Sequence, residues 1–98
     1  MILVTGAVIA KPETIAEMTR VSLEHVHRSR RELGCISHDV SINVDNPLKL
    51  HFIERWRDEA VLEAHFAVKE SRVFWRTLQS LAADPGAMAV YRSEKIEI

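Results

Sequence analysis

The sequence predicts an α+β domain in which four strands form one antiparallel sheet and the helices cover one face of it. Segments typical of strands and of helices follow each other in the order strand, helix, strand, strand, helix, strand. This order is the split βαβ, or ferredoxin-like, arrangement. The 98 residues, 47% hydrophobic and 28% charged, suit one globular domain over residues 1–98.

The first two elements are an apolar strand and an amphipathic helix. Residues 2–10 form an apolar run without alternation, which predicts a strand buried on both faces. Pro12 then opens a helix, because its missing N–H costs nothing there, and the helix runs to about Glu32 before Gly34 ends it. The inward stripe at helical spacing comprises Ile15, Met18, Ser22, Val26, Ser29 and Leu33.

The next segment predicts a β-hairpin. Residues 35–44 alternate with period two, and residues 45–47 carry the turn signal Asp-Asn-Pro. Residues 48–56 form the returning strand. With Val44 opposite Leu48, paired positions sum to 92 and His38 faces Glu54. A one-residue slip would put these two side chains on opposite faces. We expect ten side chains beneath the helices: Ile36, His38, Val40, Ile42, Val44, Leu48, Leu50, Phe52, Glu54 and Trp56.

The last third of the chain predicts a helix in two pieces and a final strand. Asp58 is a good N-cap for a helix over residues 59–66. A second helical stretch covers residues 70–83, and Asp84-Pro85-Gly86 ends it. Residues 87–98 predict the fourth strand. The apolar stripe of the second stretch comprises Phe74, Thr77, Leu78 and Leu81.

Composition excludes several classes of protein. A net charge of −1 gives no basis for binding nucleic acid, and the basic run Arg28, Arg30 and Arg31 suits a solvated helix end. The single cysteine, Cys35, cannot form an intrachain disulfide, which fits a reducing compartment. The apolar N-terminus lacks the basic region of a signal peptide and is too short to span a membrane. We expect a cytoplasmic protein with no membrane partner.

A polar pair inside the apolar layer is the first candidate for chemistry. On the register above, His38 and Glu54 lie opposite each other beside Trp56, which supplies an aromatic wall. A carboxylate beside a histidine raises the imidazole pKa and fixes its tautomer, as a general base requires. The alternative is a structural pair in which two buried polar groups satisfy each other.

Small side chains in the inward helix stripe indicate a cavity. Ser22 and Ser29 lie where large apolar residues would fill a core, and His25 lies at the edge of the same stripe. A tight contact between helix and sheet would explain the small residues equally well. His65, in the short helix, can point into the same cavity or serve a structural role. Trp75 lies off its helix stripe, which suits a dimer contact or the mouth of a pocket.

Cofactor and metal motifs are absent. The sequence has no glycine-rich phosphate loop and no dinucleotide fingerprint. It has no histidine pair spaced i, i+4 on a helix and no Cys-x-x-Cys. We therefore expect no metal and no cofactor.

Several segments, taken together, resemble the antibiotic biosynthesis monooxygenase family, and they span nearly the whole chain in order and length. They are Leu33-Gly34-Cys35-Ile36-Ser37-His38-Asp39-Val40, Asp45-x-Pro47, Ile53-Glu54-Arg55-Trp56, Asp58-x-Ala60 and Ala64-His65-Phe66.

The resemblance implies a homodimer, in which two subunits pack their open sheet faces together as a dimeric α+β barrel. It also implies a pocket between each sheet and its own helices. Some members oxygenate anthrones, naphthols or quinols with O2 and without metal, flavin or haem. We therefore expect catalytic roles for His38, Glu54 and His65. We expect substrate contacts from Trp56, Ser22, His25, Phe52 and Phe74.

The chain departs from the family pattern at two positions. His38 stands where members often have tyrosine, and Glu70 stands where many have a second histidine. The first strand has no asparagine, which disfavours the haem-degrading relatives. Three functions stay open: a cofactor-independent monooxygenase acting on a small aromatic phenol, quinol or anthrone, an isomerase of a small hydroxy-carbonyl compound, and a non-catalytic dimeric binding module for small aromatic molecules.

Overall fold

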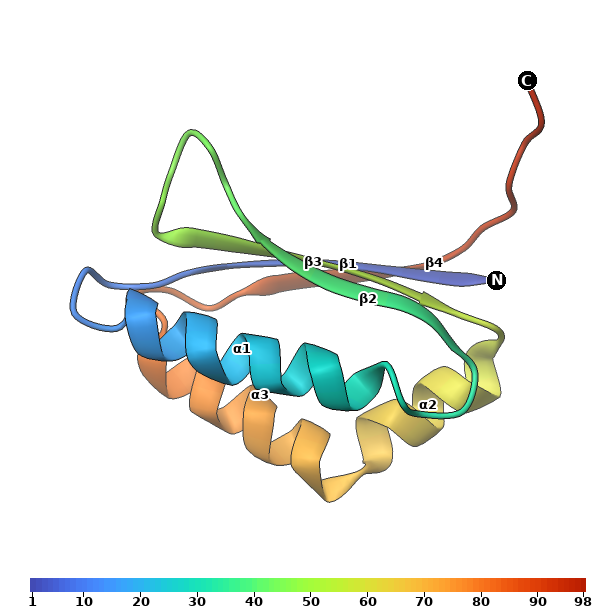
Figure 1. The fold of residues 1–98 in the computed structure, drawn as a ribbon, viewed down its shortest axis with the longest axis horizontal. Coiled ribbons are helices and arrows are strands. Elements are labelled where there is room, and N and C mark those ends of the chain that lie inside the picture. Colours follow the sequence, from blue (N-terminus) through green and yellow to red (C-terminus); the bar gives the residue numbers. More distant parts are fainter.

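The computed structural model describes all 98 residues and confirms the predicted α+β class. The elements are β1 (Ile2–Ile9), α1 (Ile15–Ser29), β2 (Cys35–Ile42), β3 (Lys49–Trp56), α2 (Glu59–Ala67), α3 (Lys69–Leu81) and β4 (Ala87–Arg92). The four strands form one antiparallel sheet in the order β2-β3-β1-β4. All three helices lie on one face of this sheet (Figure 1). None of them is both long and apolar enough to cross a membrane.

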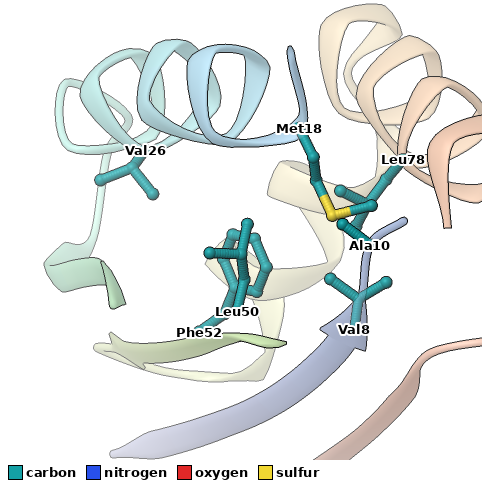
Figure 2. Close-up of a cluster of buried hydrophobic side chains, with 7 residues drawn as sticks. All are labelled: Val8, Ala10, Met18, Val26, Leu50, Phe52 and Leu78. Carbon is teal, nitrogen blue, oxygen red and sulfur yellow. The ribbon is translucent and has the colours of Figure 1, made fainter. Parts of the chain in front are cut away.

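The main core lies between the sheet and the helices α1 and α3. Met18 from α1 and Leu78 from α3 point toward the strands, and Leu50 and Phe52 of β3 meet them (Figure 2). These side chains are nearly inaccessible to water, so their burial provides much of the stabilisation. A second cluster, beneath α2, consists of Ile2, Val4, Trp56, Val61 and Leu62. The cavity described below lies beside both clusters.

The predicted hairpin register is correct over most of its length. His38 pairs with Glu54, Val40 with Phe52 and Ile42 with Leu50. It is wrong at the start of β2, where the register shifts between Cys35 and Ser37 and Cys35 pairs with Trp56. The extra residue, Ile36, is left exposed instead of lying under the helices.

The far end of the hairpin also differs from the prediction. The connection between β2 and β3 rises away from the helical layer (Figure 1). Ile42 is therefore exposed, and Val44 is 100% exposed. With Ile36, the ten side chains expected beneath the helices thus lose three members.

Helix α1 is shorter than predicted at both ends. Residues 12–14 form a turn in which the Thr14 hydroxyl accepts a hydrogen bond from the Lys11 N–H, and the helix begins at Ile15. The helix ends at Ser29, and the chain descends to β2 through turns that include Gly34 at φ +81°. Leu33 therefore leaves the inward stripe and is exposed.

The final strand is also shorter than the predicted range of 87–98. Strand β4 ends at Arg92, which pairs with Ile2 at the start of β1. Strand β4 is an edge strand with β1 as its single partner. The two strands are antiparallel, so β4 ends opposite the first residue of β1. The terminal residues run away from the sheet (Figure 1), and Ile96 and Ile98 are exposed despite their alternation with charged residues.

The sheet face opposite the helices carries apolar side chains with no cover in the chain itself. Leu3 pairs with Tyr91 of β4, and Thr5 pairs with Ile53 of β3. Ile53 is 41% exposed and Tyr91 is 51% exposed. The prediction that β1 is buried on both faces therefore holds for the helix-facing side, whereas the opposite side is half-buried.

Gly34→Ala tests the link between α1 and β2. A Cβ at this position would lie 2.6 Å from Cγ2 of Val61, and φ is +81°. We expect a loss of about 2 to 4 kcal/mol in the free energy of unfolding, from the left-handed backbone and the steric overlap. Urea unfolding measures it. Gly6→Ala is the control, because its Cβ would make ordinary contacts at 3.6 Å or more. Equal stability of Gly34→Ala and the parent chain would contradict the left-handed backbone and the close Val61 contact at this position.

Candidate active site

A cavity of about 360 Å³ lies between the sheet and the helices. Its walls are largely apolar, with Phe52 from β3 and Phe74 and Leu78 from α3 among them. This volume suits a small aromatic molecule. Every strand and every helix contributes to the lining, so the cavity exists only in the folded chain. Its polar end consists of His25, His38, Glu54 and His65.

Three histidines from three different elements meet at this polar end. His25 comes from α1, His38 from β2 and His65 from α2. Their ring centroids are 5.3 to 5.7 Å apart. One ring nitrogen of each lies within 4.8 Å of the others, and all three residues are buried. Three imidazoles at such distances form a compact polar cluster in an otherwise apolar space.

Glu54 is the only carboxylate among the lining residues of the cavity. Its Oε1 accepts a hydrogen bond of 2.9 Å from the indole Nε1 of Trp56. The same oxygen lies 3.4 Å from Nε2 of His38 and 3.8 Å from Nε2 of His65. Burial raises the pKa of Glu54 above its ordinary value, against the effect of the Trp56 hydrogen bond.

His65 is oriented by a carboxylate from another part of the chain. Its Nδ1 donates a hydrogen bond of 2.6 Å to Oε1 of Glu32, in the turn after α1. A carboxylate can only accept, so the Nδ1 carries the proton and the Nε2 of the neutral ring has a free electron pair. Arg28 stabilises this carboxylate from 3.6 Å. The free nitrogen of His65 therefore faces Glu54 at the polar end of the cavity.

His25 is held in the opposite tautomer. Its Nδ1 accepts a hydrogen bond of 2.7 Å from Nη2 of Arg28, which also donates to Ser71 at 3.2 Å. A guanidinium can only donate, so the neutral ring of His25 carries its proton on Nε2. The ring stacks on Phe74 with centroids 3.9 Å apart. The site thus contains one imidazole that accepts and one that donates.

His38 has no hydrogen-bond partner on either ring nitrogen, although the residue is only 1% exposed. Its nearest polar neighbour is Glu54, at 3.4 Å. Burial lowers the pKa of His38 to about 3, with a further contribution from His65. Burial likewise lowers the pKa of His25 to about 2. Both rings are therefore neutral near pH 7, and a buried polar group without a partner indicates a place for a ligand.

The structure brings most of the predicted site residues together, but two of them do not line the cavity. His25, His38, Phe52, Glu54, His65 and Phe74 all line it. Trp56 is fully buried, with its ring 4.5 Å from that of His65, and its indole binds Glu54. Ser22 is buried, and its hydroxyl has no partner. Trp56 therefore contacts two lining residues, His65 and Glu54, without lining the cavity itself.

Sequence reasoning missed Glu32 and misplaced Arg28. Arg28 was expected at a solvated helix end, yet it is half-buried and contacts His25. The signal that could have found the two is their i, i+4 spacing, which places an acid and a base on one side of a helix.

The mouth of the cavity lies between α3 and β4. Arg72, Trp75 and Arg76 of α3 are exposed there, and Met88 comes from β4. Trp75 therefore lies at a pocket mouth, one of its two expected places.

The sequence model of the antibiotic biosynthesis monooxygenase family matches residues 1–77. The chain therefore belongs to this family, as the resemblance of its motifs predicted. The matched range includes His25, His38, Glu54 and His65, and it stops before β4. Strand β4 nevertheless supplies Ala87 and Met88 to the cavity.

Solved structures agree with this fold. The chain superposes on an antibiotic biosynthesis monooxygenase with a TM-score of 0.89 at 24% identity, covering 97% of this chain and 100% of the other. A protein from Deinococcus radiodurans gives a TM-score of 0.94 at 23% identity, covering 100% and 98%. Among curated sequences, protein sll1783 of Synechocystis is 30% identical over 91 residues, 93% of this chain. The chain spans 62% of the length of that relative.

His38→Gln tests whether burial in the folded chain lowers the pKa of His38. A histidine whose pKa falls from 6.5 to about 3 on folding binds a proton more tightly when the chain is unfolded. Stability is therefore full above pH 6.5 and declines as pH falls toward 3, by about 1.4 kcal/mol per pH unit for each such proton. We expect the variant to decline less steeply between pH 6 and pH 4, by up to about that amount.

Urea unfolding of the chelator-treated protein at several pH values gives these slopes. Glu54, whose raised pKa acts in the opposite direction, is retained in both proteins. His27→Gln, which alters an exposed histidine of α1, is the matched control. Equal slopes for the parent chain and His38→Gln would show that His38 is not held neutral by burial.

Proposed function

We propose that the protein is a monooxygenase that oxidises a small aromatic phenol, quinol or anthrone with O2 in the cavity between its sheet and its helices. The observation that carries this proposal is the pair of opposite tautomers at the polar end. His65 offers a free electron pair on Nε2, and His25 offers an N–H on its own Nε2. One can take a proton from the substrate while the other stabilises the charge that forms.

The first step is removal of a proton from the substrate. With the aromatic ring against the apolar wall to which Phe52 and Phe74 belong, the acidic group reaches the polar end of the cavity. Nε2 of His65 accepts the proton, and Glu32 stabilises the resulting imidazolium through the 2.6 Å hydrogen bond at Nδ1. Nε2–H of His25 then donates to the substrate oxyanion. The apolar walls exclude water, which strengthens both interactions.

The second step uses the electrons of the substrate anion. The anion reduces O2, one oxygen atom enters the ring carbon, and the other leaves as water. An anthrone CH2 becomes a carbonyl in this way, a four-electron oxidation that matches the four-electron reduction of O2. No external reductant is needed. The protein contributes the base, the oxyanion donor and the apolar cavity.

Other side chains position this machinery. Trp56 holds Glu54 through its indole N–H, so we assign it a positioning role instead of the substrate contact expected from sequence. Glu54 in turn faces Nε2 of both His38 and His65. Arg72 and Arg76 at the mouth suit a substrate that carries an anionic substituent.

We further propose that the working protein is a homodimer formed through the open sheet face. That face carries half-buried apolar side chains, as the core of a protein interface does. They include Leu3, Ile53 and Tyr91. The helix-facing side of the sheet is already covered, so the cavity of each chain stays intact on assembly. A small domain also gains apolar burial that it cannot provide alone.

An isomerase of a hydroxy-carbonyl compound would use the same base and donor without O2. Oxygen consumption separates the two chemistries directly. Product formation without oxygen uptake, with a hydroxy-carbonyl substrate, would favour the isomerase.

His65→Ala and Glu32→Gln test the base. We expect oxygen uptake by the metal-free protein, measured with a panel of quinols and anthrones, to fall by at least about 100-fold in His65→Ala, because general base catalysis contributes that much. Glu32→Gln should also lose about 100-fold, because an amide can donate to Nδ1 and reverse the tautomer. Exposed residues of α1 provide matched controls, His27→Ala and Glu24→Gln. Retention of uptake in His65→Ala would refute the assignment of the base.

Ile53→Glu tests the dimer. A charge at this 41% exposed position would be buried against a second copy, so we expect a monomer in sedimentation velocity where the parent chain sediments as a dimer. Val73→Glu is the matched control, because Val73 is also 41% exposed but lies on α3, on the opposite side of the sheet. An Ile53→Glu variant that sediments as a dimer would place the interface elsewhere.

A further inference from the structure

Three ligand atoms at the polar end of the cavity are spaced as a metal site requires. Oε1 of Glu54 lies 3.4 Å from Nε2 of His38 and 3.8 Å from Nε2 of His65. Around a tetrahedral ion with bonds of about 2.0 to 2.1 Å, neighbouring ligand atoms are about 3.4 Å apart. The ring nitrogens of the two histidines belong to a group that lies within 4.8 Å. An ion could therefore contact all three residues after small side-chain movements.

The electron pairs of these ligand atoms have too few hydrogen-bond donors around them. Nε2 of His65 has a free electron pair, because the proton of that ring is on Nδ1 and is donated to Glu32. His38 is buried and has no hydrogen-bond partner at either ring nitrogen. Trp56 provides the single hydrogen bond to Glu54. Electron pairs that converge in a buried space are stabilised by a cation between them.

We propose that His38, His65 and Glu54 bind one divalent transition metal ion such as Zn²⁺. Imidazole nitrogen and carboxylate oxygen are ligands that this class of ion prefers. Glu32 acts in the outer shell, because a metal-binding histidine commonly donates its other N–H to a carboxylate.

His25 stands beside this site and is not one of its ligands. Its Nδ1 is occupied by Arg28 at 2.7 Å, so its Nε2 carries a proton and cannot bind a cation. That N–H is available to a water or substrate oxygen in a fourth position of the ion. The site is therefore of the open type, with three protein ligands and one exchangeable position.

Metal binding does not depend on the proposed oxygenation, but the two share His65. Its Nε2 cannot bind an ion and accept a proton from the substrate at the same time. A bound redox-inactive ion therefore blocks the base of the metal-free reaction. Occupancy of the site would decide whether the cavity is available for oxygenation.

Titration of the chelator-treated full chain with CoCl2 and ZnCl2, without substrate, tests the proposal. We expect calorimetry to give one ion per chain, the visible absorption of cobalt to report a low-coordinate nitrogen and oxygen site, and Zn²⁺ to raise the thermal midpoint. His38→Ala and Glu54→Gln should weaken binding at least about 100-fold, and Glu32→Gln about 10-fold. Glu54→Gln preserves the size of the side chain and an acceptor for Trp56, which protects the fold if His38→Ala does not.

His27→Ala and His25→Ala are the controls, since the first is exposed and the second is assigned no ligand role. Both should keep the ion and the cobalt spectrum. Absence of binding in the parent chain, or binding that persists in both His38→Ala and Glu54→Gln, would overturn the proposal. If the metal-free protein consumes oxygen, Zn²⁺ should inhibit it in proportion to occupancy. In a protein whose uptake is lost on His65→Ala, uptake that is unchanged with the site full would overturn the assignment of His65 as a ligand.

Discussion

The pairing of β2 with β3 is the constraint on which the rest of the site depends. It places His38 and Glu54 opposite each other on the face that the helices cover. A one-residue slip would turn one of these side chains to the open face and leave the other buried alone, at a cost of several kcal/mol. The bulge at Ile36 absorbs the mismatch with the preceding turn, so the remainder of the hairpin keeps its register.

The histidines beneath the helices are buried, and two of them are held in defined tautomers by charged residues. Arg28 and Glu32 lie at the rim, half-buried, and each engages Nδ1 of one histidine. These contacts set opposite tautomers on two rings whose centroids are 5.3 Å apart. A donor and an acceptor thus face one cavity, and Oε1 of Glu54 lies 3.4 Å from Nε2 of His38 and 3.8 Å from Nε2 of His65. The proposed acid–base chemistry and the proposed metal binding both depend on this geometry.

The limits of sequence reasoning follow from the range over which each signal acts. Period-two alternation and a recognisable turn predicted the pairing of His38 with Glu54, because both signals are local to the hairpin. The same reasoning placed Ile36 inside, since a bulge leaves no mark on the alternation. The expectation for Trp56 was incomplete for a related reason. Its burial could be predicted, whereas its hydrogen bond to Glu54 along the same strand depends on side-chain rotamers.

The sequence by itself determined the order of the elements, the strand pairing near the site, the family and the identity of the four residues at the polar end of the cavity. Periodicity, turn chemistry and motif spacing suffice for this, because they are properties of neighbouring residues. Only the tertiary structure decided which ring nitrogen of His25 and of His65 carries the proton. That choice depends on Glu32 reaching His65, 33 residues away along the chain, and on Arg28 turning inward. Contacts between distant segments exist once the helices pack on the sheet, and no local pattern encodes them.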